Sequence, residues 1–130
     1  QGSRDLTPWL TAPRAIEWLA AAGGRDGWAA VRAANDGLAA EAAGLLADEW
    51  GTRTSAPASM RGSMATVEIP ASLAALEHEP EAVRDRLASE HRIEVPVLDV
   101  GGRRWVRISA QLYNRRAQYE RLASVVARGL

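Results

Sequence analysis

The spacing of apolar residues predicts two helices in the first part of the chain. Thr11, followed by Pro13, has the properties of a helix N-cap with a first-turn proline, so residues 1–10 are expected to form an irregular loop. Gly23-Gly24 ends this first helix. From about Trp28 to Trp50 the apolar residues follow the alternating three- and four-residue spacing of one buried helix face. A second, longer helix is therefore expected there.

Strand-like patterns begin after residues 51–62, a stretch rich in Gly, Pro, Ser and Thr that is expected to be a loop. Alternating apolar residues then predict three strands, at residues 65–69, 93–97 and 105–110. Pro96 cannot donate a ladder hydrogen bond, so the second of these is expected at an edge or with its N–H positions facing outward. Gly101-Gly102 supplies the positive φ angles of a tight hairpin turn between the last two strands.

Two further helices complete the pattern. One is expected from Pro80 to about Ser89, and a terminal helix is expected after Asn114, which would cap it. The predicted order is helix, helix, strand, helix, strand, strand, helix. This order predicts an α+β fold, in which a small, mostly antiparallel three-stranded sheet is covered by helices and preceded by a long helix.

Arg107 stands in the middle of the last predicted strand. Because side chains alternate along a strand, Val106 and Ile108 share one face while Arg107 and Ser109 share the other. A guanidinium at such a position is costly to desolvate unless it meets an anion, and its planar fork suits a carboxylate. The residues alone leave two interpretations open: a binding site for an anionic ligand, or a cross-strand salt bridge to a glutamate.

The composition excludes several classes of protein. The 130 residues have a formal net charge of zero, which argues against a nucleic-acid partner. No apolar run reaches the roughly 20 residues that span a bilayer, so no membrane partner is expected. Cysteine is absent and the two histidines lack ligand spacing, so neither thiol catalysis nor a metal site is expected. A cytoplasmic location is expected.

Four motifs and the opening residues point to a known family. The motifs are Gly62–Val67, His91–Val97, Val106–Ser109 and Tyr113-Asn114. Together they resemble the C-terminal small domain of class V aminotransferases, which are fold-type I pyridoxal-phosphate enzymes. Gln1–Asp5 resembles the family's Gly-Thr-x-Asp loop, with Ser3 in place of threonine. The nearest branch is that of isopenicillin N epimerase-like enzymes and carbon–sulfur lyases.

The resemblance implies a pyridoxal 5′-phosphate cofactor and an amino-acid substrate whose α-carboxylate is bound by Arg107. Gly2 and Ser3 match the loop that contacts the cofactor phosphate of a neighbouring subunit, so a homodimer is implied. Residues 1–26 would end the large cofactor-binding domain, and residues 27–130 would form the small domain with the long interdomain helix. The reaction would be of epimerase, carbon–sulfur lyase or aminotransferase type.

The chain contains no lysine, since all 16 basic residues are arginine. Pyridoxal-phosphate catalysis on this fold needs a lysine amine for the internal Schiff base, and arginine is too basic to replace it. The chain alone is therefore expected to be inactive and to hold no catalytic residue. A large domain or a companion chain would carry the lysine. The alternative is a free-standing, non-catalytic binding module of the same fold.

Overall fold

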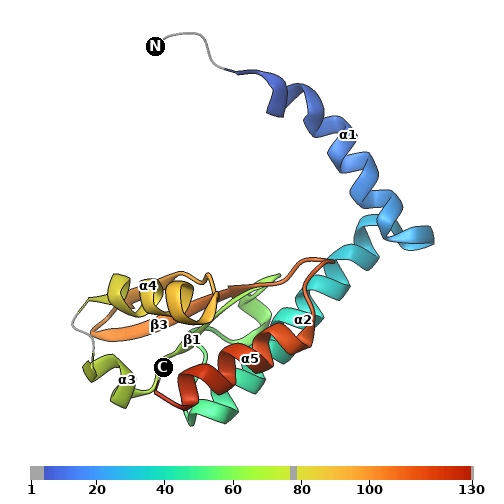
Figure 1. Ribbon diagram of the computed structural model, residues 1–130. Coiled ribbons are helices and arrows are strands. Elements are labelled where there is room, and N and C mark those ends of the chain that lie inside the picture. Colours follow the sequence, from blue (N-terminus) through green and yellow to red (C-terminus); the bar gives the residue numbers. More distant parts are fainter. Residues whose placement is uncertain (1–4, 77–78, 130) are drawn as a thin grey trace. The chain divides into compact units, whose positions relative to one another are not determined.

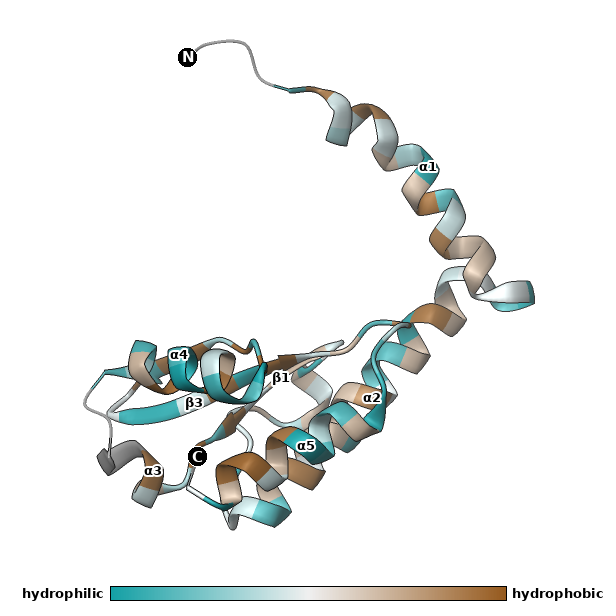
Figure 2. Cartoon of the chain, in the orientation of Figure 1, coloured by the Kyte–Doolittle hydropathy of each residue, from teal (hydrophilic) through white to brown (hydrophobic). Residues whose placement is uncertain are grey.

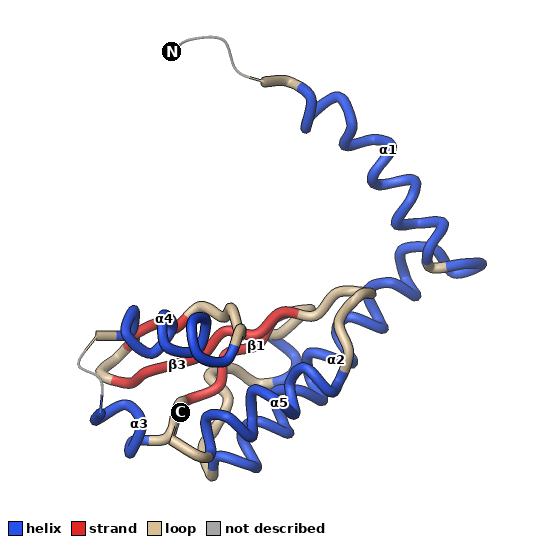
Figure 3. The backbone as a smooth tube through the Cα atoms, in the orientation of Figure 1, coloured by secondary structure: helices blue, strands red, loops and turns tan. Residues whose placement is uncertain are grey.

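The computed structural model describes residues 5–76 and 79–129, and these form an α+β fold, as the sequence predicts (Figure 3). The chain divides into two compact units, of which the first ends at Ala34 and the second begins at Asn35. The division falls within one long helix. The two units are treated separately below.

The first unit contains helix α1 (Thr7–Ala22), the short 3-10 helix η1 (Gly24–Asp26) and the beginning of α2 (Gly27–Trp50). Helix α1 begins earlier than predicted, because the first-turn proline is Pro8 and Pro13 lies inside the helix. The Thr7 amide donates to Asp5 Oδ1 over 2.9 Å. Thr11 is not a cap, since its hydroxyl donates to the Thr7 carbonyl one turn earlier at 2.9 Å. The prediction of a loop through residue 10 was wrong for this reason.

The second unit is built around a three-stranded antiparallel sheet. Its strands are β1 (Met64–Glu68), β2 (Val97–Val100) and β3 (Arg103–Ser109), in the spatial order β1-β3-β2. Figure 1 labels β1 and β3. Gly101 and Gly102 join β2 to β3 with φ angles of 61° and 71°, which confirms the predicted turn. The central strand is therefore the one that carries Arg107.

One face of this sheet forms the core with the helices. Besides the rest of α2, these are α3 (Ala71–Leu76), α4 (Pro80–His91) and α5 (Arg116–Ala127). Val67, Val106 and Ile108 are at most 2% exposed. They belong to one cluster with buried residues from each of these helices: Leu46 of α2, Leu73 of α3, Val83 and Leu87 of α4, and Leu122 and Val126 of α5. Alternation of side chains thus turns Arg107 away from this core, as predicted.

Three local predictions were wrong. Helix α3 was not foreseen, because its six residues are too few to show a helical period. Strand β2 begins at Val97 and not at residue 93, since Pro96 accepts a bond from the Arg107 amide (3.0 Å) but has no N–H to return. Asn114 does not cap α5, because its Oδ1 accepts from the Gln111 amide at 2.9 Å. Arg115 is the N-cap residue instead.

Candidate functional site

Arg107 is exposed and lies opposite Thr66 of β1 in the register of the sheet. Its backbone is fixed on both sides, by pairing with β1 and by the hydrogen bond from its amide to the Pro96 carbonyl. Its guanidinium forms no hydrogen bond or ion pair with any residue of the described ranges 5–76 and 79–129. A rigid central strand therefore presents a cation that has no counter-ion within the described chain.

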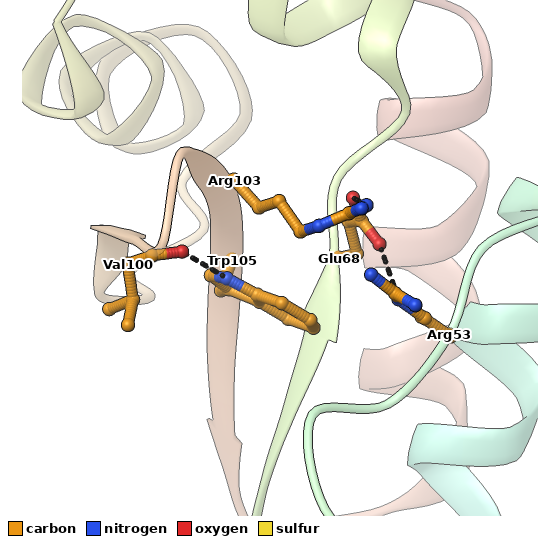
Figure 4. Close-up of polar contacts among 5 residues, drawn as sticks. All are labelled: Arg53, Glu68, Val100, Arg103 and Trp105. Carbon is orange, nitrogen blue, oxygen red and sulfur yellow. Dashed lines mark hydrogen bonds and ion pairs between the residues drawn. The ribbon is translucent and has the colours of Figure 1, made fainter.

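The cross-strand glutamate that could have paired with Arg107 is already occupied. Glu68 of β1 accepts a hydrogen bond from Arg103 at 2.7 Å and another from Arg53 at 3.0 Å (Figure 4). The bond from Arg103, followed by that from Arg53, holds the pKa of Glu68 below its usual range. Among the described residues, Arg107 thus has no glutamate partner, and its interpretation as an anion-binding residue stays a prediction.

Trp105 shares the face of β3 that carries Arg103 and Arg107, but it is only 9% exposed. Its indole N–H donates to the Val100 carbonyl at 3.2 Å (Figure 4). The register places Trp105 opposite Glu68 on one side and Leu98 on the other. Side chains of the sheet therefore cover the face around Trp105, whereas the face around Arg107 is exposed to solvent.

A pocket of about 390 Å³ lies beside Arg107. Its wall combines the segment of residues 92–96, the end of β3, the turn at Tyr113-Asn114 and one side of α5. The Tyr119 hydroxyl donates to the Ser109 carbonyl at 2.7 Å and so ties α5 to the end of β3. Burial raises the pKa of Tyr119, which keeps the phenol neutral as a hydrogen-bond donor.

The pocket wall is rich in positive charge. It contains Arg92, Arg107 and Arg121, with Glu94 as the one carboxylate among the described lining residues. Sequence reasoning identified Arg107 but missed Arg92 and Arg121. Arg92 lies within a motif that carries the family resemblance, yet nothing in the pattern of residues indicates that it faces the same pocket as Arg107.

The arginines on the pocket wall suit the binding of a small anion. Among the described residues, no group of three or more His, Cys, Asp or Glu side chains could hold a metal ion.

Gly2 and Ser3, the residues expected at the cofactor phosphate, lie outside the described residues. No helix in the described part of the chain is long and apolar enough to cross a bilayer.

Comparison with known proteins identifies relatives over nearly the whole chain. It is 32% identical over 148 aligned residues to the putative L-cysteine desulfhydrase 2 of Oryza sativa subsp. japonica, covering 98% of this chain. It is 30% identical over 142 residues to the L-cysteine desulfhydrase of Arabidopsis thaliana, covering 96%. It is 33% identical over 129 residues to the isopenicillin N epimerase of Amycolatopsis lactamdurans, covering 97%.

The chain spans only part of these relatives, namely 30%, 31% and 30% of their respective lengths. No protein-family model matches the chain.

Proposed function

This chain is homologous to one portion of the L-cysteine desulfhydrases and isopenicillin N epimerases, and on that premise we propose that it is the C-terminal part of a pyridoxal-phosphate-dependent enzyme acting on an amino acid. The reaction would be an epimerisation, a carbon–sulfur lysis or a transamination. The names of the relatives favour the first two types.

The observation that carries the proposal is the guanidinium of Arg107, which has no partner among the described residues, on a rigid strand beside a pocket of amino-acid size. In the proposed enzyme it binds the α-carboxylate of the substrate through two parallel hydrogen bonds. A bidentate contact fixes the orientation of the substrate as well as its position, and orientation determines which bond at Cα is weakened. Arg107 thus acts by binding and positioning.

The cofactor would supply the electron sink for breaking a bond at Cα or Cβ. No residue of this chain can hold it through a Schiff base, because the chain has no lysine. We therefore place the lysine on a large domain or companion chain. The described residues of this chain contribute recognition of the amino acid, and Gly2 and Ser3, which lie outside them, remain the proposed contacts to the cofactor phosphate.

We further propose that residues 1–26 end the large domain and that residues 27–130 form the small domain of a cytoplasmic homodimer. Helix α1 supports the first assignment, since no residue along it is buried. Four of its large apolar side chains are strongly exposed: Trp9 78%, Leu10 77%, Ile16 56% and Trp18 68%. Figure 2 shows hydrophobic patches along its length. Such a surface is typical of a helix that another part of a protein normally covers.

Replacement of Arg107 tests the proposal in the full-length enzyme that contains this chain. The Arg107→Ala variant loses a charge-assisted bidentate contact worth about 2–4 kcal/mol, so KM for the amino acid should rise by roughly 30-fold or more. The absorbance of the bound cofactor should stay nearly unchanged, because Arg107 does not hold it. Steady-state kinetics and an absorption spectrum measure the two effects.

Arg103→Gln is the matched control. Arg103 lies on the same strand and the same face, but it pairs with Glu68 and does not line the pocket. Its KM should match that of the unmodified enzyme. An unchanged KM in Arg107→Ala would refute the proposed binding of the substrate carboxylate by Arg107. A rise in KM of equal size in both variants would show a general effect of positive charge and not a specific contact.

A further inference from the structure

The pocket beside Arg107 differs from the rest of the second unit in how its arginines are paired. Most described arginines outside the pocket have a carboxylate partner, namely Arg53, Arg84, Arg86, Arg103, Arg104 and Arg116. Arg92 and Arg107, by contrast, make no contact with a carboxylate of the described chain, and Arg121 contacts a backbone carbonyl. Cations gathered on one concave wall raise the local positive potential and favour an anion there.

Arg92 occupies a backbone position where an arginine is unusual. It is the one non-glycine residue with positive φ in the described chain, at φ 54° and ψ 42°. This left-handed conformation ends α4: the Ile93 amide donates to the Leu87 carbonyl at 3.0 Å, and the Arg92 amide to the Ala88 carbonyl at 3.0 Å. Glycine is the usual residue at such a helix end. An arginine therefore occupies this position although its left-handed backbone conformation is unfavourable for any residue other than glycine.

Arg121 is held at the pocket wall from the opposite side. It belongs to α5, and its Nη2 donates to the His91 carbonyl at 2.6 Å, next to Arg92 in the chain. This bond uses one of five guanidinium N–H donors, so the others remain available. The Arg121 guanidinium thus lies at the end of α4, and Arg92, Arg107 and Arg121 all line the pocket.

From this arrangement we propose that Arg92 and Arg121 bind a second carboxylate on the substrate, so that the preferred substrate is an amino acid whose side chain ends in a carboxylate. This inference rests on the proposed function, in which Arg107 takes the α-carboxylate. One carboxylate would leave the pocket with more arginines than anions, even with Glu94 counted. A volume of about 390 Å³ accommodates an amino acid of this class.

Calorimetric titration of the full-length enzyme with glutarate and with butyrate tests the inference. These acids have related carbon chains and differ in the second carboxylate, and neither has an amino group that reacts with the cofactor. The unmodified enzyme should bind glutarate about ten-fold more tightly than butyrate, the effect of one additional charge-assisted contact. The double variant Arg92→Gln/Arg121→Gln should lose this preference and keep its affinity for butyrate.

Arg128→Gln is the control, because Arg128 lies seven residues beyond Arg121, at the end of α5, and does not line the pocket. It should keep the preference for glutarate. Arg92→Gln alone, at an exposed position, provides a second test if loss of the Arg121 contact to His91 impairs folding. A preference for glutarate that survives both Arg92→Gln and the double variant overturns the inference.

Arg107→Gln separates this inference from the proposed function. If Arg107 binds the first carboxylate, this variant binds both acids more weakly. If it binds both acids as well as the unmodified enzyme does, the proposed function fails. If Arg107→Gln weakens the binding of both acids while the double variant leaves the preference for glutarate intact, the proposed function stands. The proposal of a second carboxylate site is then wrong.

Discussion

At the scale of single residues, the availability of Arg107 depends on how the neighbouring charges are distributed. Glu68 accepts from both Arg103 and Arg53, and Asp99 forms two hydrogen bonds with the buried Arg104, at 2.8 and 2.9 Å. The carboxylates that the sheet brings near β3 are thus already bound. The Arg107 guanidinium has no carboxylate partner among the described residues because its charged neighbours pair with one another.

Arg92 offers a test in which stability and recognition change in opposite directions. An arginine in the left-handed region is strained, and glycine adopts this conformation without strain. Arg92→Gly should therefore raise the free energy of unfolding by about 0.5–1 kcal/mol, although it removes a side chain from the pocket. Chemical denaturation of this chain measures the effect. A loss of stability would show that the Arg92 side chain contributes to the fold, and its role in the pocket would then need another explanation.

At the scale of elements, strand β3 determines where each of its side chains lies. It pairs with β1 along one edge and with β2 along the other, so its backbone has little freedom to shift. Its even-numbered residues Val106 and Ile108 are buried in the core, which fixes the register. A slip of one residue would bury Arg107 and expose this apolar pair. The core therefore positions the proposed binding residue.

The ion pairs of Glu68 with Arg53 and Arg103 lead to a prediction of how the stability of the folded chain responds to acid. The pKa of Glu68 is lowered in the folded chain, so its contribution is complete above the ordinary glutamate pKa and is lost as pH falls through the folded value. Stability should therefore decrease between about pH 5 and pH 3, in part through Glu68. Glu68→Gln should be less stable than the original chain at pH 7, and the difference should shrink over this range.

Urea denaturation of the original chain and of Glu68→Gln at several pH values measures the difference between their free energies of unfolding. Asp99, whose pKa is also lowered, by its hydrogen bond to Arg104, remains in both chains and adds equally to their acid sensitivity. A difference between the chains that stays constant from pH 7 to pH 3 would contradict the assignment to Glu68.

At the scale of the whole molecule, the two units differ in how they bury apolar residues. The second unit has a continuous core with members from its sheet and its helices. In the first unit, α1 has no buried residue and four large apolar side chains that are more than half exposed. This contrast is expected if the first unit belongs to the surface that meets the rest of the proposed enzyme. It is not expected of a free-standing module.

The chain on its own should consequently self-associate. Sedimentation velocity should detect species larger than a monomer at micromolar concentration, and the double variant Trp9→Gln/Leu10→Gln should reduce them, because it removes the two most exposed apolar residues of α1. The circular dichroism spectra of the unmodified chain and of the double variant should be similar. If the unmodified chain is a stable, cofactor-free monomer, the alternative of an independent binding module is favoured.

Much of the fold could be predicted from the sequence. Long apolar periods identify α2 and α5, and the alternation around Val67 and Ile108 identifies two strands, because burial of one face demands these spacings. The ends of elements were harder to predict. Asn114 could cap a helix or bond locally, and its Oδ1 accepts from the Gln111 amide three residues earlier. Pro96 accepts from the Arg107 amide, which the fold brings near, and this position precedes the start of β2.

The candidate site was predictable in one residue only. Arg107 stands out in the sequence because a cation in an apolar strand needs an anion, and the family resemblance assigns it a ligand. Arg92 and Arg121 lie 15 residues before it and 14 residues after it in the chain, on other elements, and no local pattern marks them. The tertiary structure brings them to one wall: Tyr119 of α5 bonds Ser109 at the end of β3, and Arg121 of α5 bonds the His91 carbonyl at the end of α4.

The sequence by itself determined the α+β class, the strand that carries Arg107 and the face on which Arg107 lies, since these follow from residue type and period. The tertiary structure alone decided that Glu68 is taken by Arg53 and Arg103, that Arg107 is left without a counter-ion in the described chain, and that two more arginines share its pocket. Charge pairing depends on distances of a few ångströms between residues far apart in sequence, and the folded chain sets those distances.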